Sequence, residues 1–458
     1  KQGLATADDF RFVRAWWEVP AERILDSMRY AEGGRQKAEG SGRKEREEGK
    51  WTEERIRDFQ AWCRRRTYEG KRWVPFAKGG EYSPYYADIH LVVNWENEGE
   101  EIKNNRNEKG NVRSNVWMLR DTAANYFFRP GLTFRNRPHK LGSFAVLPVG
   151  CLFSHVGQAA FIREDIKHVL ALLNTRMTTA FIMLSSGRGQ EGSGQTIKFE
   201  TGLVASLPIA EQICKHEALA QFGMASYRGL QKIDQNSENS HVFTCPKLIR
   251  VEAATLAERT SGYAKQVAKA KDELQEIQSK VDEIAFDLYG FTEEERRAVG
   301  RGRYAEGNGQ KETGGENADE CAMDESDGDS TDDETTSSSS GSAYRVLHTA
   351  CFLSWCVGVA FGRWDVRIAL DPSLAPKLPD PFDPLPVCPP GMLVGPDGLP
   401  AEANRIVSEE WLRARPDANT LPPQGSVKNP TIPDSDYPLR ISWDGVLVDD
   451  PGFNGDRP

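Results

Sequence analysis

The chain has 458 residues, which is more than one ordinary domain holds, so we expect two or three domains. Its eight cysteines form no Cys-x-x-Cys pair and have no histidine at ligand spacing, which argues against a zinc site or a disulfide framework and favours reduced thiols. No signal peptide is visible, and the longest apolar run near the C-terminus, about 13 residues at 350–362, is shorter than the roughly 20 residues that span a bilayer. These features predict a cytoplasmic protein with no membrane segment.

The formal net charge of −10 is concentrated in one tract. Residues 304–343 contain twelve Asp or Glu and one Lys, a net charge of −11, which leaves +1 for the rest of the chain. This low-complexity tract has too little apolar surface to offset the entropy of ordering it. We therefore predict a disordered acidic linker at 304–343. The rest of the chain is close to neutral, so any binding of charged ligands there depends on local patches of charge.

Residues 1–84 are predicted to form a helical connector. The stretch 43–72 has apolar residues near helical spacing and a surplus of basic residues, typical of a solvated amphipathic helix. Residues 88–95 are mostly apolar and lie between Pro84 and Gly99, which favours a strand.

The segment 102–140 is the strongest electrostatic candidate in the chain, with nine basic and two acidic residues, a net charge of +7. Phe127, Phe128 and Phe134 are interleaved with these charges. Arginines and lysines hold phosphates, and aromatic rings can stack or wedge against bases. The alternative is a basic loop face without function. The candidate DNA-binding residues here are Lys103, Arg106, Arg113, Arg129, Arg135, Arg137 and Lys140.

Residues 85–210 are predicted to form one mixed domain. Short buried strands are expected at 142–161, a helix over 163–186, and a glycine-rich loop at 187–198 followed by a last strand that ends at Pro208.

Residues 211–303 are predicted to be a helical packing element. Apolar residues alternate three and four apart over three heptads within 250–290, and "TEEE" from Thr292 is a capping box that opens another helix. Packing within the chain is the commoner outcome for so short a seam, and dimerisation is the alternative.

The C-terminal piece, 344–458, is predicted to contain a buried helix with an extended exit, a proline-rich segment at 371–403, and a short strand pair in "DYPLRISWDGVLVDDPG". The predicted fold class is α+β, with a target-recognition-type mixed domain, a coiled-coil-like helical element, the acidic linker and a smaller C-terminal α/β piece.

Common catalytic motifs are absent from the sequence. GxxxxGK[ST], GxSxG and HExxH do not occur, and no residues with metal-ligand spacing are found. No catalytic, cofactor-binding or metal-binding residue is therefore predicted.

Several stretches resemble, in order, the part that follows the catalytic domain of large adenine-specific DNA methyltransferases of the fused restriction–modification type, including the PglX methyltransferases of BREX phage-exclusion systems. They include "QGLATADDFRFVRAWWEV", "VNWENEGEEIKN", "NVWMLRDTAANYFFRPGLTFRNR", "LLNTRMTTAFIMLSSGRGQEGSGQTIKFETGLVASLPI" and "YPLRISWDGVLVDDP". The resemblance implies double-stranded DNA and a catalytic methyltransferase domain as partners. It implies S-adenosylmethionine as the cofactor of the parent enzyme.

The sequence departs from the family where catalysis occurs. The glycine-containing loop that holds S-adenosylmethionine and the (N/D/S)-P-P-(Y/F) motif that receives the flipped adenine are both absent. The chain is therefore not expected to bind the cofactor or to methylate by itself. Bases would be read by side chains on loops such as 187–198, and the candidates there are Arg188, Gln190 and Gln195.

Two alternatives stay open at this point. One is a stand-alone DNA specificity subunit that works with a separate methylase. The other is a protein-interaction scaffold organised by the 250–290 helix.

Overall fold

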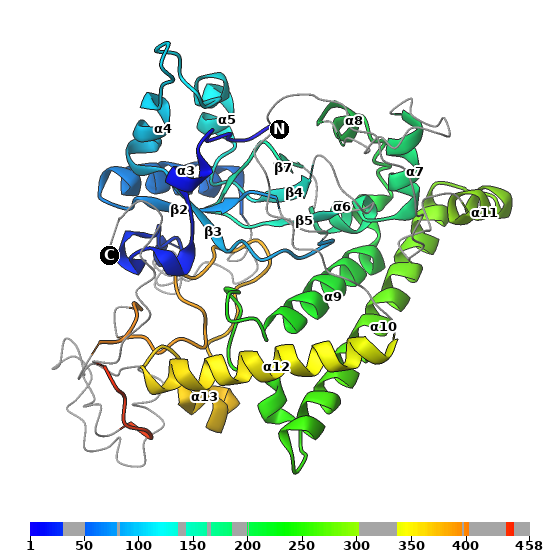
Figure 1. Cartoon of the computed structure of the whole chain (residues 1–458). Helices are drawn as coiled ribbons and strands as arrows, with labels where there is room; N and C mark the ends of the chain where they lie inside the picture. The colour runs from blue at the N-terminus through cyan, green and yellow to red at the C-terminus, as the bar shows by residue number, and fades with distance from the viewer. Residues whose placement is uncertain are drawn as a thin grey trace, which may run out of the picture.

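A computed structural model describes residues 1–30, 51–79, 83–135, 143–162, 166–185, 199, 201–301, 337–395, 398–402 and 437–443 (Figure 1). The α+β class is confirmed: two small sheets lie beside a set of long helices. The predicted linker is outside the described residues as far as residue 336, whereas its last residues, 337–343, are not disordered but form the start of helix α12 (Ser337–Ala360). Five candidate site residues also lie outside them: Arg137, Lys140, Arg188, Gln190 and Gln195.

The first sheet has four strands in the order β1-β3-β2-β6. Its strands are β1 (Val13–Ala15), β2 (Trp73–Ala77), β3 (Leu91–Asn94) and β6 (Leu152–Phe153). β3 pairs antiparallel with both β1 and β2, whereas β2 and β6 run parallel. The predicted strand at 88–95 is confirmed as β3, which is three residues shorter at its start and one residue shorter at its end.

Helix α3 (Glu53–Tyr68) packs its apolar stripe into the core of this sheet. The Thr52 side chain caps it by accepting a hydrogen bond from the Arg55 N–H, and Phe59 and Cys63 are fully buried. The predicted amphipathic helix is therefore confirmed over 53–68. Residues 69–72 turn away from it, and 43–50 lie outside the described part.

The second sheet is antiparallel with the order β5-β4-β7. Its strands are β4 (Gly131–Arg135), β5 (Phe144–Leu147) and β7 (Gly157–Ala160). The short buried strands predicted at 142–161 are confirmed as β5, β6 and β7.

The single helix predicted over 163–186 is two helices, α6 (Ile166–Leu173) and α7 (Arg176–Ser185). They are separated at Asn174 and Thr175. The Asn174 side chain accepts a hydrogen bond from Phe144 N on β5, and the Thr175 hydroxyl donates to Leu172 O in the last turn of α6.

The strand predicted to end at Pro208 is wrong. Residues 201–205 form a short helix, α8 (Thr201–Ala205), with no buried side chain. No described strand pairs with this stretch, so its backbone is satisfied locally, as in the bond from Ser206 N to Gly202 O (3.1 Å).

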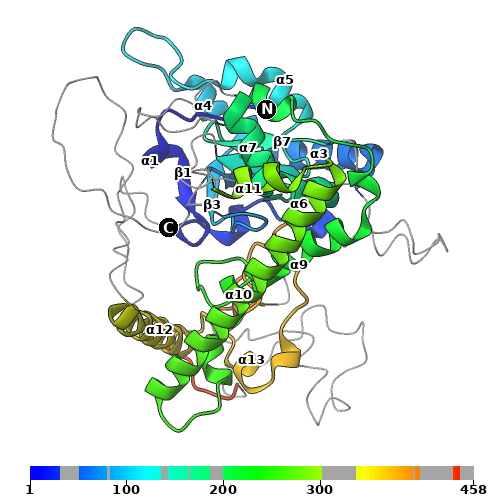
Figure 2. The ribbon, with the colours of Figure 1, turned by 90° about the vertical axis from the view of Figure 1, so that its right-hand side faces the viewer.

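Long helices form the other half of the molecule: α9 (Glu217–Asp234), α10 (Leu256–Leu288), α11 (Glu293–Arg301) and α12 (Ser337–Ala360). Figures 1 and 2 show α10 running diagonally past α9 and crossing α12. The capping box predicted at Thr292 is confirmed, with Glu295 as its partner at the start of α11. A second capping box, which was not predicted, pairs Thr255 with Glu258 at the start of α10.

The heptad seam of α10 packs within the chain. Leu274 lies so close to α9 that a Cβ on Gly229 would be 2.8 Å from its Cδ2 atom, and Tyr263 meets the ring of His348 on α12 edge to face (4.9 Å). The seam residues Val267 and Val281 are buried. Intramolecular packing, not dimerisation, therefore uses this seam.

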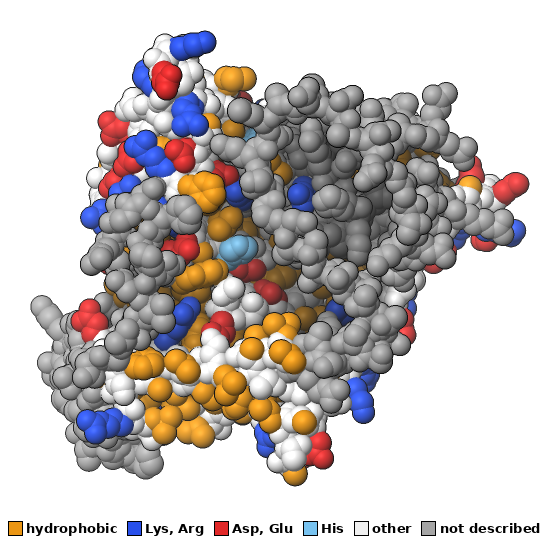
Figure 3. All heavy atoms as spheres, viewed as in Figure 1, with side chains coloured by type: hydrophobic (Ala, Val, Ile, Leu, Met, Phe, Trp, Pro, Cys, Tyr) orange, Lys and Arg blue, Asp and Glu red, His pale blue; other side chains and the backbone are white. Residues whose placement is uncertain are grey.

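The helix predicted as fully buried at the start of the C-terminal piece is only half-buried. α12 turns Trp355 and Val359 into the core, while its other face exposes Val346, Leu347, Leu353 and Val357. In Figure 3 this face is a band of apolar side chains over α12. Residues 346–360 contain no Asp, Glu, Lys or Arg, so this face carries no formal charge.

Two further expectations for the C-terminal piece are wrong. The exit of α12 is not extended, because Asp365 caps a short helix, α13 (Val366–Leu370), and forms a buried ion pair with Arg367 (2.6 Å). The described part of the predicted strand pair, 437–443, contains no strand. Instead it is a loop whose Tyr437 donates a hydrogen bond to Asp365 (3.0 Å) and packs near Leu393.

Short helices complete the described chain. The α-helices are α1 (Asp9–Phe12), α4 (Glu100–Asn104) and α5 (Arg120–Asn125). The 3₁₀ helices are η1 (Trp16–Glu18), η2 (Ala21–Arg23), η3 (Glu96–Glu98), η4 (Val116–Leu119), η5 (Ile213–Lys215), η6 (Lys247–Arg250) and η7 (Pro372–Leu374). Among the residues that the structure describes, we find no helix with the length and apolar character needed to cross a bilayer.

Candidate nucleic-acid interface

The basic segment folds into a small projection, which we call the basic lobe, residues 102–120. Figures 1 and 2 show it with α4 and α5 at one end of the molecule, beyond the edge of the first sheet. A hairpin-like turn forms its tip: Arg106 and Val112 form an antiparallel bridge, and the Asn107 carboxamide accepts hydrogen bonds from the N–H groups of Lys109 and Asn111 (both 3.0 Å).

The lobe is fixed to the core on its inner side. Ile102, Val116 and Leu119 are buried in the same cluster as the first sheet. Asn115 ties the lobe to the N-terminal segment, because its side chain donates to Gly3 O (3.0 Å) and accepts from Ala5 N (2.8 Å). The lobe therefore presents its outer side chains from a braced support.

Five basic side chains and one acidic side chain, Glu108, give the lobe a net charge of +4. Four of the basic side chains are exposed and one, Lys103, is half-buried. The exposed ones are Arg106, Lys109, Arg113 and Arg120. In Figure 3, Lys and Arg side chains gather at this corner of the surface, together with some acidic ones at its base.

Internal partners engage part of this charge. The Arg106 guanidinium donates to Gly110 O within its own turn (2.7 Å), and Arg113 lies 4.0 Å from Asp8. Both side chains nevertheless remain open to solvent, so each can turn to a phosphate without unfolding the lobe.

Arg129 and Arg135 lie outside the lobe. Arg129, with a side chain 19% exposed, forms a two-pronged ion pair with Glu53 on α3. Arg135 is half-buried at the end of β4. Of the seven candidates in 102–140, the structure therefore brings together Lys103, Arg106 and Arg113.

The proposed aromatic contacts to bases from Phe127, Phe128 and Phe134 are wrong, since all three rings are buried in the core. Phe127 packs edge to face on Trp95 (5.4 Å) and Phe153 (5.3 Å), and Phe134 packs on Phe144. Burying such large apolar rings in the core lowers the free energy more than leaving them exposed to solvent.

Two apolar side chains that sequence reasoning did not single out are exposed on the lobe instead. Trp117 is 44% exposed and Met118 is 85% exposed, and the Arg120 guanidinium lies over the Trp117 ring (5.1 Å). In a 3₁₀ helix residues three apart share a face, so burying Val116 and Leu119 turns the two residues between them outward. The run "VWML" is apolar throughout, and only this register distinguishes its inner from its outer residues.

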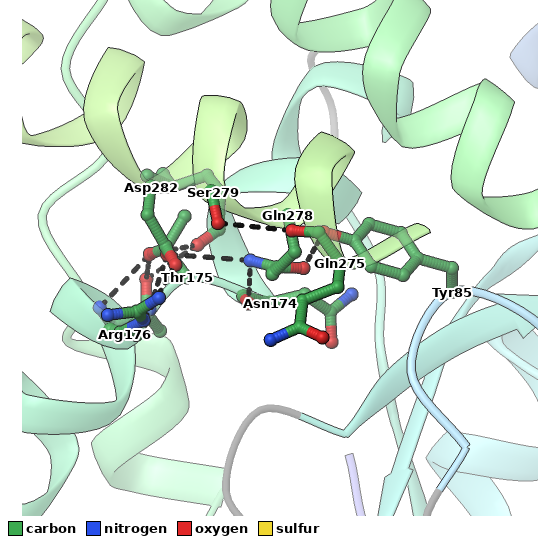
Figure 4. Close-up of polar contacts among 10 residues, drawn as sticks. Tyr85, Asn174, Thr175, Arg176, Gln275, Gln278, Ser279 and Asp282 are labelled. Atoms are coloured by element: carbon green, nitrogen blue, oxygen red, sulfur yellow. Dashed lines mark hydrogen bonds and ion pairs between the residues drawn. The ribbon is translucent and has the colours of Figure 1, made fainter. Parts of the chain in front are cut away.

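A polar junction fixes α10 to the second sheet and its helices (Figure 4). The Tyr85 hydroxyl donates to Gln278 Oε1 (2.6 Å), and Gln278 Nε2 donates to Asn174 O (3.0 Å). One turn further along α10, Asp282 accepts from the Arg176 N–H (2.8 Å) and pairs with its guanidinium (3.0 Å). Burial raises the pKa of Asp282 to about 6.

The described cavity beneath the proline-rich segment is too small for a base or a cofactor. It has a volume of about 20 Å³, enough for roughly one water molecule, and is lined by Asp88, Tyr227, His241 and the prolines of 379–386. Within the described ranges, no group of three or more His, Cys, Asp or Glu side chains is placed to hold a metal ion.

The described strands also do not fit the S-adenosylmethionine site that the resemblance attributes to the parent enzyme. The parallel pair β2 and β6 is not joined by a single strand–loop–helix crossover, since β3, β4 and β5 intervene in the chain.

No protein-family model matches the sequence. Two curated proteins are similar to about half of it. The adenine-specific methyltransferase PglX of Lacticaseibacillus casei (strain Zhang) is 29% identical over 237 residues, which are 49% of this chain and 18% of that protein. The adenine-specific methyltransferase BrxX of Escherichia coli O9:H4 (strain HS) is 25% identical over 247 residues, which are 53% of this chain and 18% of that protein.

The matched region thus spans less than a fifth of the length of either relative. The resemblance to adenine-specific methyltransferases of the PglX type, inferred above from the order of several short stretches, is confirmed by these two matches.

Proposed function

We propose that this chain is the DNA-recognition portion of a site-specific adenine methyltransferase, and that the basic lobe holds the DNA backbone. The observation that carries the proposal is the lobe itself, in which exposed cations stand on an apolar base that is fixed to the core. Double-stranded DNA presents one phosphate charge per roughly 1.7 Å of helix axis, so such a lobe gains affinity by releasing counterions.

Catalysis belongs, in this proposal, to a methyltransferase domain that acts as the partner of this chain. The support is that the sequence contains neither a cofactor loop nor an adenine-binding motif, while the relatives it matches are methyltransferases and are several times longer than the match. S-adenosylmethionine would be held by that domain, and the biological role would be phage defence or restriction–modification.

The scaffold alternative is weakened by the position of α10. Its apolar seam is already covered by α9 and α12, so it offers no free heptad face to a partner helix. A stand-alone specificity subunit differs from the first proposal only in whether the methyltransferase is on the same polypeptide, and it predicts the same lobe contacts.

The test is the salt dependence of binding to duplex DNA, measured by fluorescence anisotropy. We expect a linear fall of log affinity with log salt, and a triple variant, Arg106→Gln with Lys109→Gln and Arg113→Gln, should reduce the slope by roughly 2 to 3. The matched control changes three exposed lysines of α10 in the same way: Lys265, Lys269 and Lys271.

The control should change the slope by less than about 0.5, because charges that do not touch phosphate release no counterions. Equal losses in the two triple variants would mean that only net charge matters, and the lobe would then not be the interface. Absence of any salt-dependent binding would remove the DNA-recognition proposal itself.

A further inference from the structure

The outer face of η4 combines two features that rarely occur together on a solvated surface. Met118 is 85% exposed and Trp117 is 44% exposed, although both are large and apolar. The same lobe exposes the cations Arg106, Lys109 and Arg113, and Glu108 is the single acidic side chain of residues 102–120.

The support beneath these two side chains is rigid. Val116 and Leu119 are buried on the opposite face of the same 3₁₀ helix, and Asn115 binds the start of that helix to the N-terminal segment through two hydrogen bonds. The Arg120 guanidinium over the Trp117 ring holds that ring in place and adds a charge beside it. An apolar tip on such a support keeps its direction when it is pushed against a ligand.

Few ligands offer both an apolar slot and a surrounding ring of negative charge. A duplex does so at each base step, where the flat faces of the bases are apolar and phosphates flank both grooves. Proteins that kink DNA insert Met, Leu, Ile or Phe between base pairs in this way, and an indole ring serves equally as a stacking platform. The charge of the lobe fits either DNA or an acidic protein, and the apolar slot repeated at every base step favours DNA.

We propose that Met118 and Trp117 form a wedge that enters duplex DNA at a base step, with Met118 between the base pairs and Trp117 against the face of an unstacked base. This inference rests on the proposed DNA-recognition function and adds to it a local opening of the duplex by this chain. Opening the stack beside a target adenine would lower the free energy needed to turn that base out of the helix.

The experiment compares two probes: an intact duplex of about 30 base pairs, and the same duplex with a one-nucleotide gap, in which stacking is already broken. Unstacking a base step takes a few kcal/mol, so the wild-type chain should bind the gapped duplex about tenfold or more tightly than the intact one. Met118→Ala should reduce this ratio to about one, and Met118→Leu should retain it, because leucine is also an effective wedge.

The matched control is Leu370→Ala, which shortens another largely exposed apolar side chain (71%) on α13, remote in the chain from the lobe. It should leave the ratio unchanged. A Trp117→Ala variant should reduce the ratio without changing the salt slope, since no phosphate contact is lost.

The outcomes separate the two proposals. If the wild-type chain binds DNA with the expected salt slope but Met118→Ala keeps the full preference for the gapped duplex, the wedge is wrong and the phosphate-binding lobe stands. If the wild-type chain binds neither probe, both proposals fail. A lost preference in Met118→Ala, with rescue by Met118→Leu and an unchanged salt slope, supports the wedge.

Discussion

The guanidinium of Arg129 is bound to the carboxylate of Glu53, with Nη1 2.9 Å from Oε2, across 76 residues of chain. Glu53 stands in the first turn of α3, where a negative charge also interacts favourably with the helix dipole. The pair joins the start of β4 to the start of α3. The density of basic residues in the sequence predicts that Arg129 binds phosphate. In the structure, Arg129 instead holds β4 and α3 together.

Arg129→Gln is therefore expected to affect stability and not DNA binding. The free energy of unfolding should fall by about 1 kcal/mol, the usual value for a partly buried two-pronged pair. Arg113→Gln should do the reverse, with stability changed by less than about 0.5 kcal/mol and the salt slope reduced by roughly 0.9. Urea unfolding and anisotropy titrations measure the two effects, and a reduced slope in Arg129→Gln would place that residue on the DNA after all.

Asn174 acts as a substitute strand partner for β5. Its Oδ1 accepts from Phe144 N (3.0 Å), and its Nδ2 donates to Phe144 O (2.8 Å) and to Leu170 O (3.0 Å). Asn174→Ala leaves the buried N–H of Phe144 without this partner, while the C=O of Phe144 still accepts from Tyr85 N (2.8 Å). We expect a loss of about 2 kcal/mol in unfolding free energy.

The control for this substitution is Asn125→Ala on α5, where the side chain is exposed and bonds to Asp121 on its own helix. Its removal should change stability by less than about 0.5 kcal/mol. A loss under about 1 kcal/mol for Asn174→Ala would mean that water or a shift of α6 re-satisfies Phe144, and the junction would then be less rigid than its hydrogen bonds suggest.

The elements that could be predicted from the sequence are those fixed by local patterns. The heptad spacing of α10 and the Thr292 capping box depend on residues within a turn or two of one another, and both were predicted correctly. The strands at 142–161 could be predicted because short apolar runs bounded by proline and glycine residues are typical of buried strands.

The elements that could not be predicted depend on partners far away in the chain. Residues 201–205 have strand-like composition, yet no described strand pairs with them, so they form α8. The break between α6 and α7 follows from the bonds of Asn174 to β5, which an apolar period does not reveal.

The candidate site shows the same division. Counting charges correctly located a basic segment, and Arg106 and Arg113 are exposed in it. Counting did not reveal that Phe127 and Phe128 face the core, or that Glu53 neutralises Arg129, because both depend on which elements are packed against that segment.

The two faces of α12 should respond differently to substitution. Trp355 is buried against Val359 and Trp364, so Trp355→Ala is expected to lower the unfolding free energy by about 3 to 5 kcal/mol. Leu353→Ala, on the exposed face, should change it by less than about 0.5 kcal/mol. Thermal or urea unfolding distinguishes the two, and a large loss for Leu353→Ala would show that this face is covered in solution.

The carboxyl group of Asp282 gives the junction of α10 a defined pH response. Burial raises its pKa from 3.8 to about 6, and the nearby Glu283 carboxylate acts in the same direction, while hydrogen bonds and charge from Arg176 and a hydrogen bond from Gln278 oppose the rise. The folded chain therefore binds this proton more tightly than the unfolded chain does. The free energy penalty of the charged carboxylate is absent below about pH 4 and complete above about pH 6, so this group makes the fold less stable as pH rises between those values.

Asp282→Asn removes the titration but keeps an oxygen that accepts from the Arg176 N–H. Relative to the wild-type chain, the unfolding free energy of the variant should rise by about 3 kcal/mol as pH goes from 4 to 7, because a shift of about two pKa units corresponds to that amount. Taking the difference between the two chains cancels the titration of all other carboxylates. Urea unfolding at pH 4, 5, 6 and 7 gives this difference directly, and a constant difference over that range would mean that Asp282 titrates at the same pH in the folded and unfolded chain.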